Sequence, residues 1–165
     1  MASEGLYRAK WTDLIHDEWT RNLKKDRPDI DPHKIDRTRD LMNRAVLDCM
    51  VTGFEDLIPN LELPDPSDRH VLAAAIKCNA DGIVTFNRKD FSTEIETQFG
   101  VEVQHPDDFL LAQLDLDEPK VITCLRECRS RLKNPPETAG EFLDRLGRQT
   151  LPKFVAQLRD WESIL

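Results

Sequence analysis

Three acidic residues lie where separate elements of the fold can bring them together. Glu18 shares the apolar stripe of an early predicted helix, Asp68 lies at the start of a later helix, and Asp90 follows a short apolar strand. A glutamate that points inward is costly unless its charge is compensated, and a shared divalent cation would compensate it. Mg²⁺ and Mn²⁺ prefer oxygen ligands, and they activate water for attack on a phosphodiester. The pattern therefore predicts a metal centre formed by these carboxylates.

The same residues also have a purely structural interpretation. Asp65, Pro66 and Asp68 are typical of a helix start, because aspartate caps a helix, proline fits its first turn and negative charge suits its N-terminal dipole. Helix starts of this kind are more common than metal sites. In this interpretation Asp90 caps the next segment and Glu18 faces solvent. Spacing alone leaves both interpretations open.

The elements predicted around these acids indicate an α/β fold. Residues 71–76 are apolar nearly all round and predict a buried helix, while residues 83–86 predict a buried parallel strand. A second strand is expected at 100–103, followed by a helix over 105–114. The alternation of helices and strands favours a parallel sheet, whose ligands bind at the carboxyl ends of the strands. Asp90 therefore lies where chemistry is expected.

The residues before this region predict a short strand and two helices. The strand is expected at 5–11, and a helix begins at Thr12 and ends at Pro28. Asp31 and Pro32 open the second helix as cap and first residue.

Residues 115–165 show only helical patterns, so we expect a helical annex to a domain of residues 1–114. Thr138 and Glu141 have the spacing of a capping box. Thr150 is expected to cap the last helix.

The charge of the chain limits its partners. The 165 residues have a net charge of −8, and all of this excess lies in residues 1–114, because residues 115–165 hold equal numbers of acidic and basic side chains. The acidic balance argues against a large basic face that grips duplex DNA. It is compatible with an enzyme acting on RNA, whose site needs carboxylates of its own.

The composition also predicts where the protein resides. No apolar run approaches the ~18 residues of a membrane span, and the N-terminus lacks the pattern of a secretory signal. The four cysteines form no CxxC pair, and we interpret them as reduced thiols, at least three of them buried. We therefore expect a cytoplasmic protein without a membrane partner.

Two longer stretches resemble the PIN domain, the nuclease fold of VapC-type toxins. Residues 63–75 read LPDPSDRHVLAAA and residues 83–91 read IVTFNRKDF. They are similar to a bacterial PIN subfamily with a DRHVLAAA helix and a VTFNxxDF strand end. The resemblance covers about residues 5 to 111, and the helical annex resembles the tail of that subfamily. It implies a three-layer α/β/α fold with a short parallel sheet and a C-terminal helical annex.

The resemblance implies a metal-dependent endoribonuclease, the toxin of a toxin–antitoxin pair, using Mg²⁺ or Mn²⁺. Glu18, Asp68 and Asp90 match the catalytic acids. The implied metal ligands are these three residues together with the neighbouring Asp65. The supporting and RNA-binding residues implied by the resemblance are Thr85 and Asn87, and Arg69 and Arg88. In many relatives a small antitoxin that also binds DNA inhibits the nuclease.

The sequence departs from the family at its start. PIN domains begin with an apolar strand that ends in a nearly obligatory aspartate, and this strand is missing before Gly5. Asp13 is the nearest later acid, but nothing places it at the same spot. We expect weak Mn²⁺ binding by the isolated chain if all the acids are needed.

Three interpretations of the missing strand remain. The gene is truncated or its start misassigned; another chain donates the strand, by swapping or in a homo-oligomer; or the chain is a degenerate, non-catalytic PIN-like interaction module. An unrelated phosphatase-like hydrolase is disfavoured because the chain has no DxDx[TV] motif.

Overall fold

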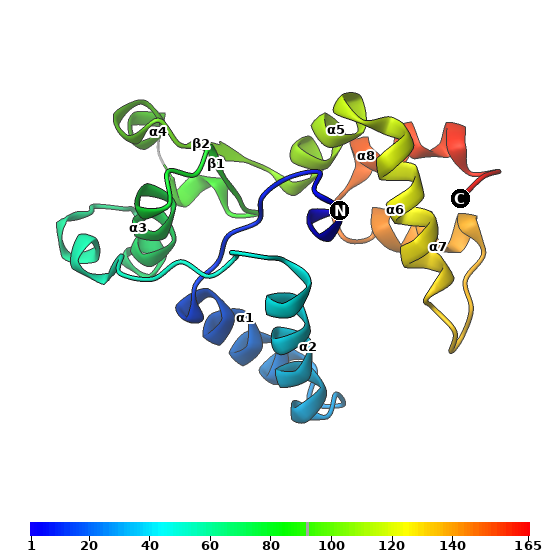
Figure 1. Ribbon diagram of the computed structural model, residues 1–165, viewed down its shortest axis with the longest axis horizontal. Coiled ribbons are helices and arrows are strands. Elements are labelled where there is room, and N and C mark those ends of the chain that lie inside the picture. The colour runs from blue at the N-terminus through cyan, green and yellow to red at the C-terminus, as the bar shows by residue number, and fades with distance from the viewer. Residues whose placement is uncertain (92) are drawn as a thin grey trace.

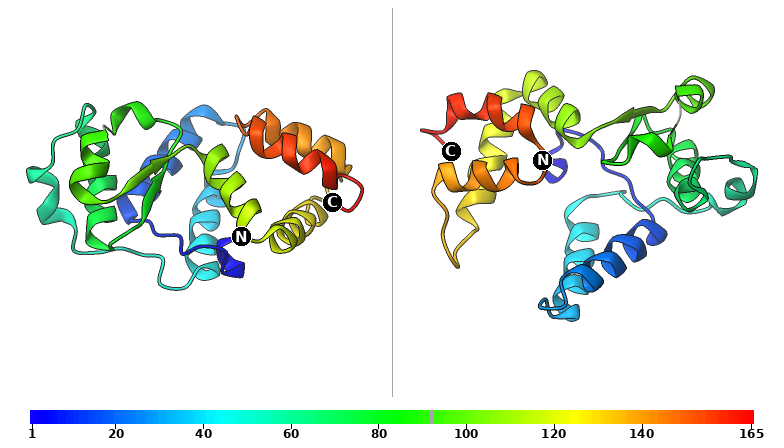
Figure 2. Two further views of the ribbon diagram at one scale, coloured as in Figure 1. Left: turned by 90° about the horizontal axis from the view of Figure 1, so that it is seen from above. Right: turned by 180° about the vertical axis from the view of Figure 1, so that it is seen from behind.

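The computed structural model describes residues 1–91 and 93–165, and over these residues the chain is mostly helical with one short parallel sheet. Figure 1 shows the sheet at one end, the helices α5–α8 at the other, and the α1–α2 pair projecting away from both. Both views in Figure 2 keep the sheet apart from the α5–α8 helices, and the right-hand view again shows the α1–α2 pair projecting. The elements are α1 (Asp13–Asp26), α2 (Pro32–Ala45), α3 (Arg69–Lys77), β1 (Gly82–Val84), α4 (Thr93–Phe99), β2 (Glu102–Gln104), α5 (Pro106–Leu116), α6 (Glu118–Ser130), α7 (Ala139–Gly147) and α8 (Pro152–Leu158).

The sheet consists of β1 and β2, paired in parallel with Ile83 opposite Val103. Both of these side chains are buried in a core with the alanines of α3. Gly82 allows the strands to approach, because a Cβ at this position would lie 2.8 Å from the carbonyl oxygen of Glu102. The expected α/β character, with a buried alanine-rich helix before a parallel strand, is confirmed.

The strand β1 is less covered than the sequence predicts. Val84 is 45% exposed and Phe86, which follows the strand, is 62% exposed. Among the described residues β1 pairs only with β2, so one edge of β1 is open. The prediction that the whole 83–86 run is buried was wrong, because side chains alternate between the two faces of a strand, and the face opposite the buried Ile83 is left exposed at Val84.

The predicted strand at 5–11 was also wrong. Only Trp11 makes a strand-like contact, a parallel bridge to Met50. The residues before it form an extended connection, with Leu6 packed against the α5–α8 core and Tyr7 in edge-to-face contact with Phe109 of α5. This segment therefore spans two parts of the molecule instead of lying in a sheet.

The caps expected for the first two helices are present. The Thr12 side chain accepts a hydrogen bond from the Ile15 N–H and begins α1, and Asp31 accepts from the His33 N–H and begins α2. These bonds satisfy N–H groups that a helix leaves free in its first turn.

The helices α5–α8 enclose a second core around Phe142, Leu143, Phe154 and Leu158. α5 contributes Leu114 to this core, although the expected division places that helix in the first domain. The division into 1–114 and 115–165 stays a prediction.

The caps in this part follow the prediction in one helix and not in another. The Thr138 capping box with Glu141 is confirmed at the start of α7. Thr150 does not cap α8; its φ is +59° and its hydroxyl donates to the Gln149 carbonyl. Asp107 of α5 caps α8 instead, because its carboxylate accepts hydrogen bonds from the backbone N–H groups of Lys153 and Phe154 at 3.0 and 2.9 Å.

The cysteines are unpaired, but fewer of them are buried than expected. Cys49 and Cys124 are buried, Cys78 is half-buried and Cys128 is exposed. Over the described part of the chain, no helix combines the length and apolar character needed to span a membrane.

The Asp107 cap leads to a matched prediction. Replacing Asp107 by Ala leaves two N–H groups at the start of α8 without a partner. We therefore expect the free energy of unfolding to fall by about 2–3 kcal/mol. The neighbouring Asp108→Ala variant loses only an exposed ion pair to Lys153, and its free energy of unfolding should fall by at most about 1 kcal/mol. Urea unfolding of both variants measures the difference, and equal losses would contradict the assigned role of Asp107.

Candidate metal centre

Three carboxylates from two separate segments meet beside the sheet. Asp65, Asp68 and Asp90 each offer an oxygen atom, and these atoms lie within 4.8 Å of one another. Asp65 and Asp68 lie on either side of the turn that begins α3, and Asp90 ends the short 3₁₀ helix Arg88–Asp90 after β1. The α3–β1 unit brings them together, because its helix and strand pack on one core.

The surroundings of Asp68 disfavour the charged form of its carboxyl. Burial raises the pKa of the Asp68 carboxyl, and the charges of Asp65, Asp90 and Glu18 raise it further, against a smaller opposing effect of His70. Asp68 therefore holds a negative charge that its surroundings disfavour.

Asp65 has the opposite environment. The Ser67 hydroxyl and backbone N–H donate to its Oδ1 at 2.7 and 2.8 Å. These hydrogen bonds hold the pKa of Asp65 below its usual range. Asp65 thus keeps the helix-start role expected from the sequence and contributes its charge to the same cluster.

Asp90 is held from the strand side. Its side chain is largely buried at 9% exposure, and the Asn87 amide donates to its Oδ2. The Thr85 hydroxyl accepts a hydrogen bond from the Asn87 N–H at 3.1 Å, and the Thr85 N–H donates to Gln104 of β2. Thr85 and Asn87 therefore act as a short chain of contacts that orients Asp90 from the sheet.

Glu18 lies beside the three aspartates but outside their cluster. Its carboxylate is 3.4 Å from Nε2 of His70, and its side chain is 43% exposed. The sequence left two positions open for Glu18, inward or facing solvent, and the structure places its side chain between them, at the rim. Its charge still acts on Asp68.

A buried network fixes the helix that carries Glu18. The ring of His16 is fully buried; its Nδ1 accepts from the Trp19 indole at 2.8 Å, and its Nε2 faces Oδ1 of Asn43 at 2.9 Å. Because an indole N–H can only donate, Nε2 of His16 carries the proton and donates to Asn43. The Trp11 indole donates to the same oxygen at 2.7 Å. The network binds α1 to α2 and orients the face of α1 that bears Glu18.

The two arginines expected to contact RNA lie in different surroundings. Arg69 is half-buried at the start of α3, and its Nε has no hydrogen-bond partner among the residues that the structure describes. Arg88 is exposed and lines a cavity of about 500 Å³ together with residues of α5 and of the segment leading into α8. Arg88 therefore faces the α5–α8 helices, away from Arg69.

Two residues near the acids had no role assigned from the sequence. His70 contacts Glu18 and influences Asp68, and Lys89 influences Asp65. The spacing of His70 from Asp68 gave no signal, because side chains two residues apart on a helix do not face each other. The position of Lys89 next to Asp90, after a parallel strand, was a usable signal, because ligands bind at the carboxyl ends of such strands.

The donor set fits a hard divalent cation. The cluster offers only oxygen atoms, as Mg²⁺ and Mn²⁺ prefer, and the disfavoured charge of Asp68 is one that a cation would offset. When bound, such an ion supplies charge stabilisation at a phosphate and a more nucleophilic water. Asp65, Asp68 and Asp90 are the residues that would hold it, with Glu18 at the rim; this role stays a prediction.

The raised pKa of Asp68 gives a stability prediction. A carboxyl whose pKa is higher in the folded than in the unfolded chain stabilises the fold while it is protonated. This stabilisation is lost as the pH rises through the folded-state pKa. Asp68→Asn removes this loss, so in EDTA at pH 7 we expect its Tm to exceed that of the wild type by about 1–2 °C, given about 0.5 kcal/mol for a partly exposed like-charge contact. The gain should vanish below about pH 3.9, the usual carboxyl pKa.

The matched control is Glu62→Gln, which neutralises an exposed acid of the same half of the chain and should leave Tm unchanged. Calorimetric melts between pH 3 and 8 provide the measurement. A lower Tm for Asp68→Asn at pH 7 would contradict the repulsion described here.

Two comparisons with known proteins find relatives. The profile of the VapC50 C-terminal domain family matches residues 106–160, which include α5 to α8. The chain is 40% identical over 107 residues, 65% of its length, to "Putative ribonuclease VapC50" of Mycobacterium tuberculosis (strain ATCC 25618 / H37Rv). The match spans 62% of the length of that relative. No solved structure matches the chain significantly. The matches confirm the resemblance seen in the sequence: over 107 residues the chain is similar to a VapC-type protein, and residues 106–160 are similar to the C-terminal domain of VapC50.

Proposed function

We propose that the chain is a metal-dependent endoribonuclease of PIN type that hydrolyses RNA phosphodiesters with Mg²⁺ or Mn²⁺. The observation that carries the proposal is the meeting of Asp65, Asp68 and Asp90 within 4.8 Å. Three carboxylates at this distance repel one another in the absence of a counter-charge. The name of the mycobacterial relative, a ribonuclease, supports the same chemistry.

The residues of the site have separate tasks in this proposal. Asp65, Asp68 and Asp90 hold the ion, Glu18 acts at the rim, and Asn87 keeps Asp90 in place. Because Glu18 and the aspartates are acidic, the phosphate is bound by cationic side chains. We assign this task to Arg69 and Arg88. The proposed fold is the three-layer α/β/α arrangement of PIN domains.

The biological setting proposed from the VapC-like relatives is a toxin–antitoxin pair in the cytoplasm. In that setting a small antitoxin protein inhibits the nuclease by binding it. A second chain that adds a strand to the open edge of β1, in a homo-oligomer or by swapping, belongs to the same proposal.

A second function has a specific observation in its favour. Among the described residues β1 pairs with β2 alone, and Val84 and Phe86 are exposed. A strand that is paired on one side and uncovered on one face gives a weaker framework for Asp90. A degenerate PIN-like module that binds partners without cutting RNA would tolerate that arrangement. It predicts no metal-dependent cleavage of any RNA.

The experiment that separates the two functions is RNA cleavage with and without Mn²⁺. We expect the wild type to cleave an RNA substrate with unpaired segments in Mn²⁺ and not in EDTA. Asp68→Asn should lose at least about 100-fold in rate, since removing one group of a preorganised charged site typically costs about 3 kcal/mol or more. Circular dichroism should show that the variant is folded.

Glu62→Gln is the control that changes charge away from the site and should cleave at the wild-type rate. Equal cleavage by Asp68→Asn and wild type would reject the assigned site. Absence of cleavage by a folded wild-type protein on all RNAs tested would favour the non-catalytic module.

A further inference from the structure

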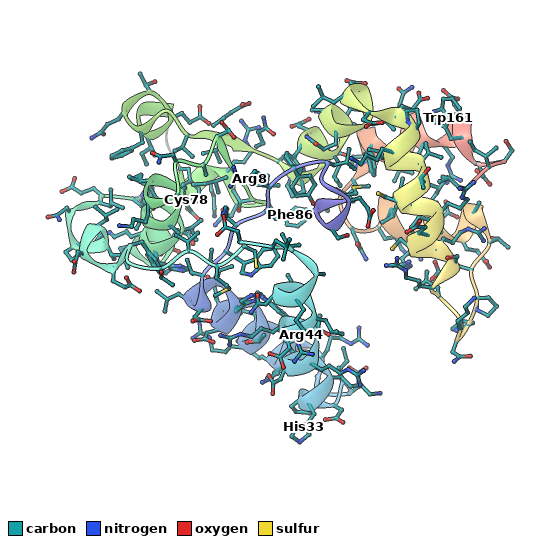
Figure 3. All side chains as sticks on the ribbon, in the orientation of Figure 1. Arg8, His33, Arg44, Cys78, Phe86 and Trp161 are labelled. Atoms are coloured by element: carbon teal, nitrogen blue, oxygen red, sulfur yellow. The ribbon has the colours of Figure 1, made fainter. Side chains whose placement is uncertain are left out.

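An exposed aromatic ring lies between the acids and the α5–α8 helices. Phe86 follows β1, is 62% exposed, and its ring makes an edge-to-face contact with His105, the residue that caps α5, at 5.3 Å between centroids. Figure 3 shows Phe86 between the sheet and the C-terminal helices. One face of the ring pair is therefore open to a ligand, although large aromatic side chains are usually buried.

The cavity beside this ring has cationic groups at its rim. Its lining includes His105 and Arg88 from the sheet side and Thr150 and Lys153 from the helices. Arg88 makes no ion pair with any described residue, whereas Lys153 pairs with Asp108 at 2.6 Å. The second acid of the lining, Asp107, is turned inward onto backbone N–H groups.

An aromatic face next to cationic side chains is suited to an unpaired nucleotide. Bases stack on aromatic rings whatever their sequence, and Lys or Arg bind the phosphates between them. Arg88 lies two residues after Phe86 and two before Asp90, so the ring, the cation and one acid of the cluster lie on one short segment after β1. A protein partner would have less use for the charges that flank the ring.

We propose that Phe86, His105, Arg88 and Lys153 form a binding path for single-stranded RNA that leads from the C-terminal helices to the acids. The path rests on the proposed ribonuclease function and adds two points to it. Phe86 is the residue on which a base of the substrate stacks, and the C-terminal helices contribute a phosphate contact through Lys153. These helices are therefore part of the substrate cleft.

The test measures binding without cleavage. A fluorescein-labelled single-stranded RNA of about 15 nucleotides is titrated in EDTA, followed by anisotropy, and the same strand is then tested as a duplex. Phe86→Ala should raise the single-strand Kd about 5- to 100-fold, the effect of losing one stacked base. It should leave the weaker duplex binding unchanged, because paired bases cannot stack on the ring, and Phe86→Trp should retain tight binding.

Lys153→Ala tests the contribution of the C-terminal helices. We expect the dependence of log Kd on log salt to fall by about 0.7, the value for one phosphate contact to a single strand. The control variants, Leu116→Ala and Lys133→Ala, remove an exposed apolar and an exposed cationic side chain of the C-terminal half and should bind like the wild type.

The inference is overturned if Phe86→Ala and Lys153→Ala bind single-stranded RNA as the wild type does. It is also overturned if Phe86→Ala changes only self-association, measured by sedimentation, because Phe86 would then serve a protein interface. Its failure is distinguishable from that of the ribonuclease proposal, which is decided by cleavage in Asp68→Asn and does not depend on binding in EDTA.

Discussion

Electrostatic repulsion among Asp65, Asp68 and Asp90 is the constraint around which this half of the structure is arranged. Three carboxylates within 4.8 Å are retained only where the surrounding fold holds them in place, since like charges destabilise a folded chain. The fold does so by local means. Asp65 is bound by Ser67, Asp90 is bound by Asn87, and Asp68 begins the buried helix α3. The repulsion disfavours the charged form of Asp68, the acid whose pKa is raised.

The elements around the cluster hold it from three sides. The α3 helix and β1 share one core and position the aspartates. The buried His16 network fixes α1 against α2 and thereby brings Glu18 to the rim. The α5–α8 helices have a core of their own and are tied to the rest by β2 and by the extended segment with Tyr7. The acids thus lie where several independently packed parts meet, as is common for binding sites.

Local signals in the sequence predicted the elements that depend on neighbouring residues. The Thr12 and Asp31 caps, the Thr138 capping box and the parallel strand after an alanine-rich helix rest on short-range chemistry. The predictions that failed depend on distant contacts. α8 takes its cap from Asp107, more than forty residues earlier, so Thr150 next to the helix was a misleading candidate. The exposure of Val84 and Phe86 depends on whether another element packs on their face of the sheet, which a local sequence pattern does not determine.

The candidate site shows the same division. The acids at the start of α3 and after β1 are positioned by their own elements, so their proximity could be anticipated from topology. The position of Glu18 at the rim depends on the packing of α1 on α2, and the separation of Arg88 from Arg69 depends on the α5–α8 helices. These are tertiary outcomes that spacing along the chain does not determine.

The central claim is that the three aspartates form a divalent-cation site. Isothermal titration of Mn²⁺ into the wild type, Asp68→Asn and Glu62→Gln tests it most directly. We predict saturable binding of Mn²⁺ to the wild type and to Glu62→Gln, and a loss of at least about tenfold in affinity for Asp68→Asn, as removal of one anionic ligand implies. Equal Mn²⁺ binding by all three proteins, or no binding by the wild type, would contradict the claim.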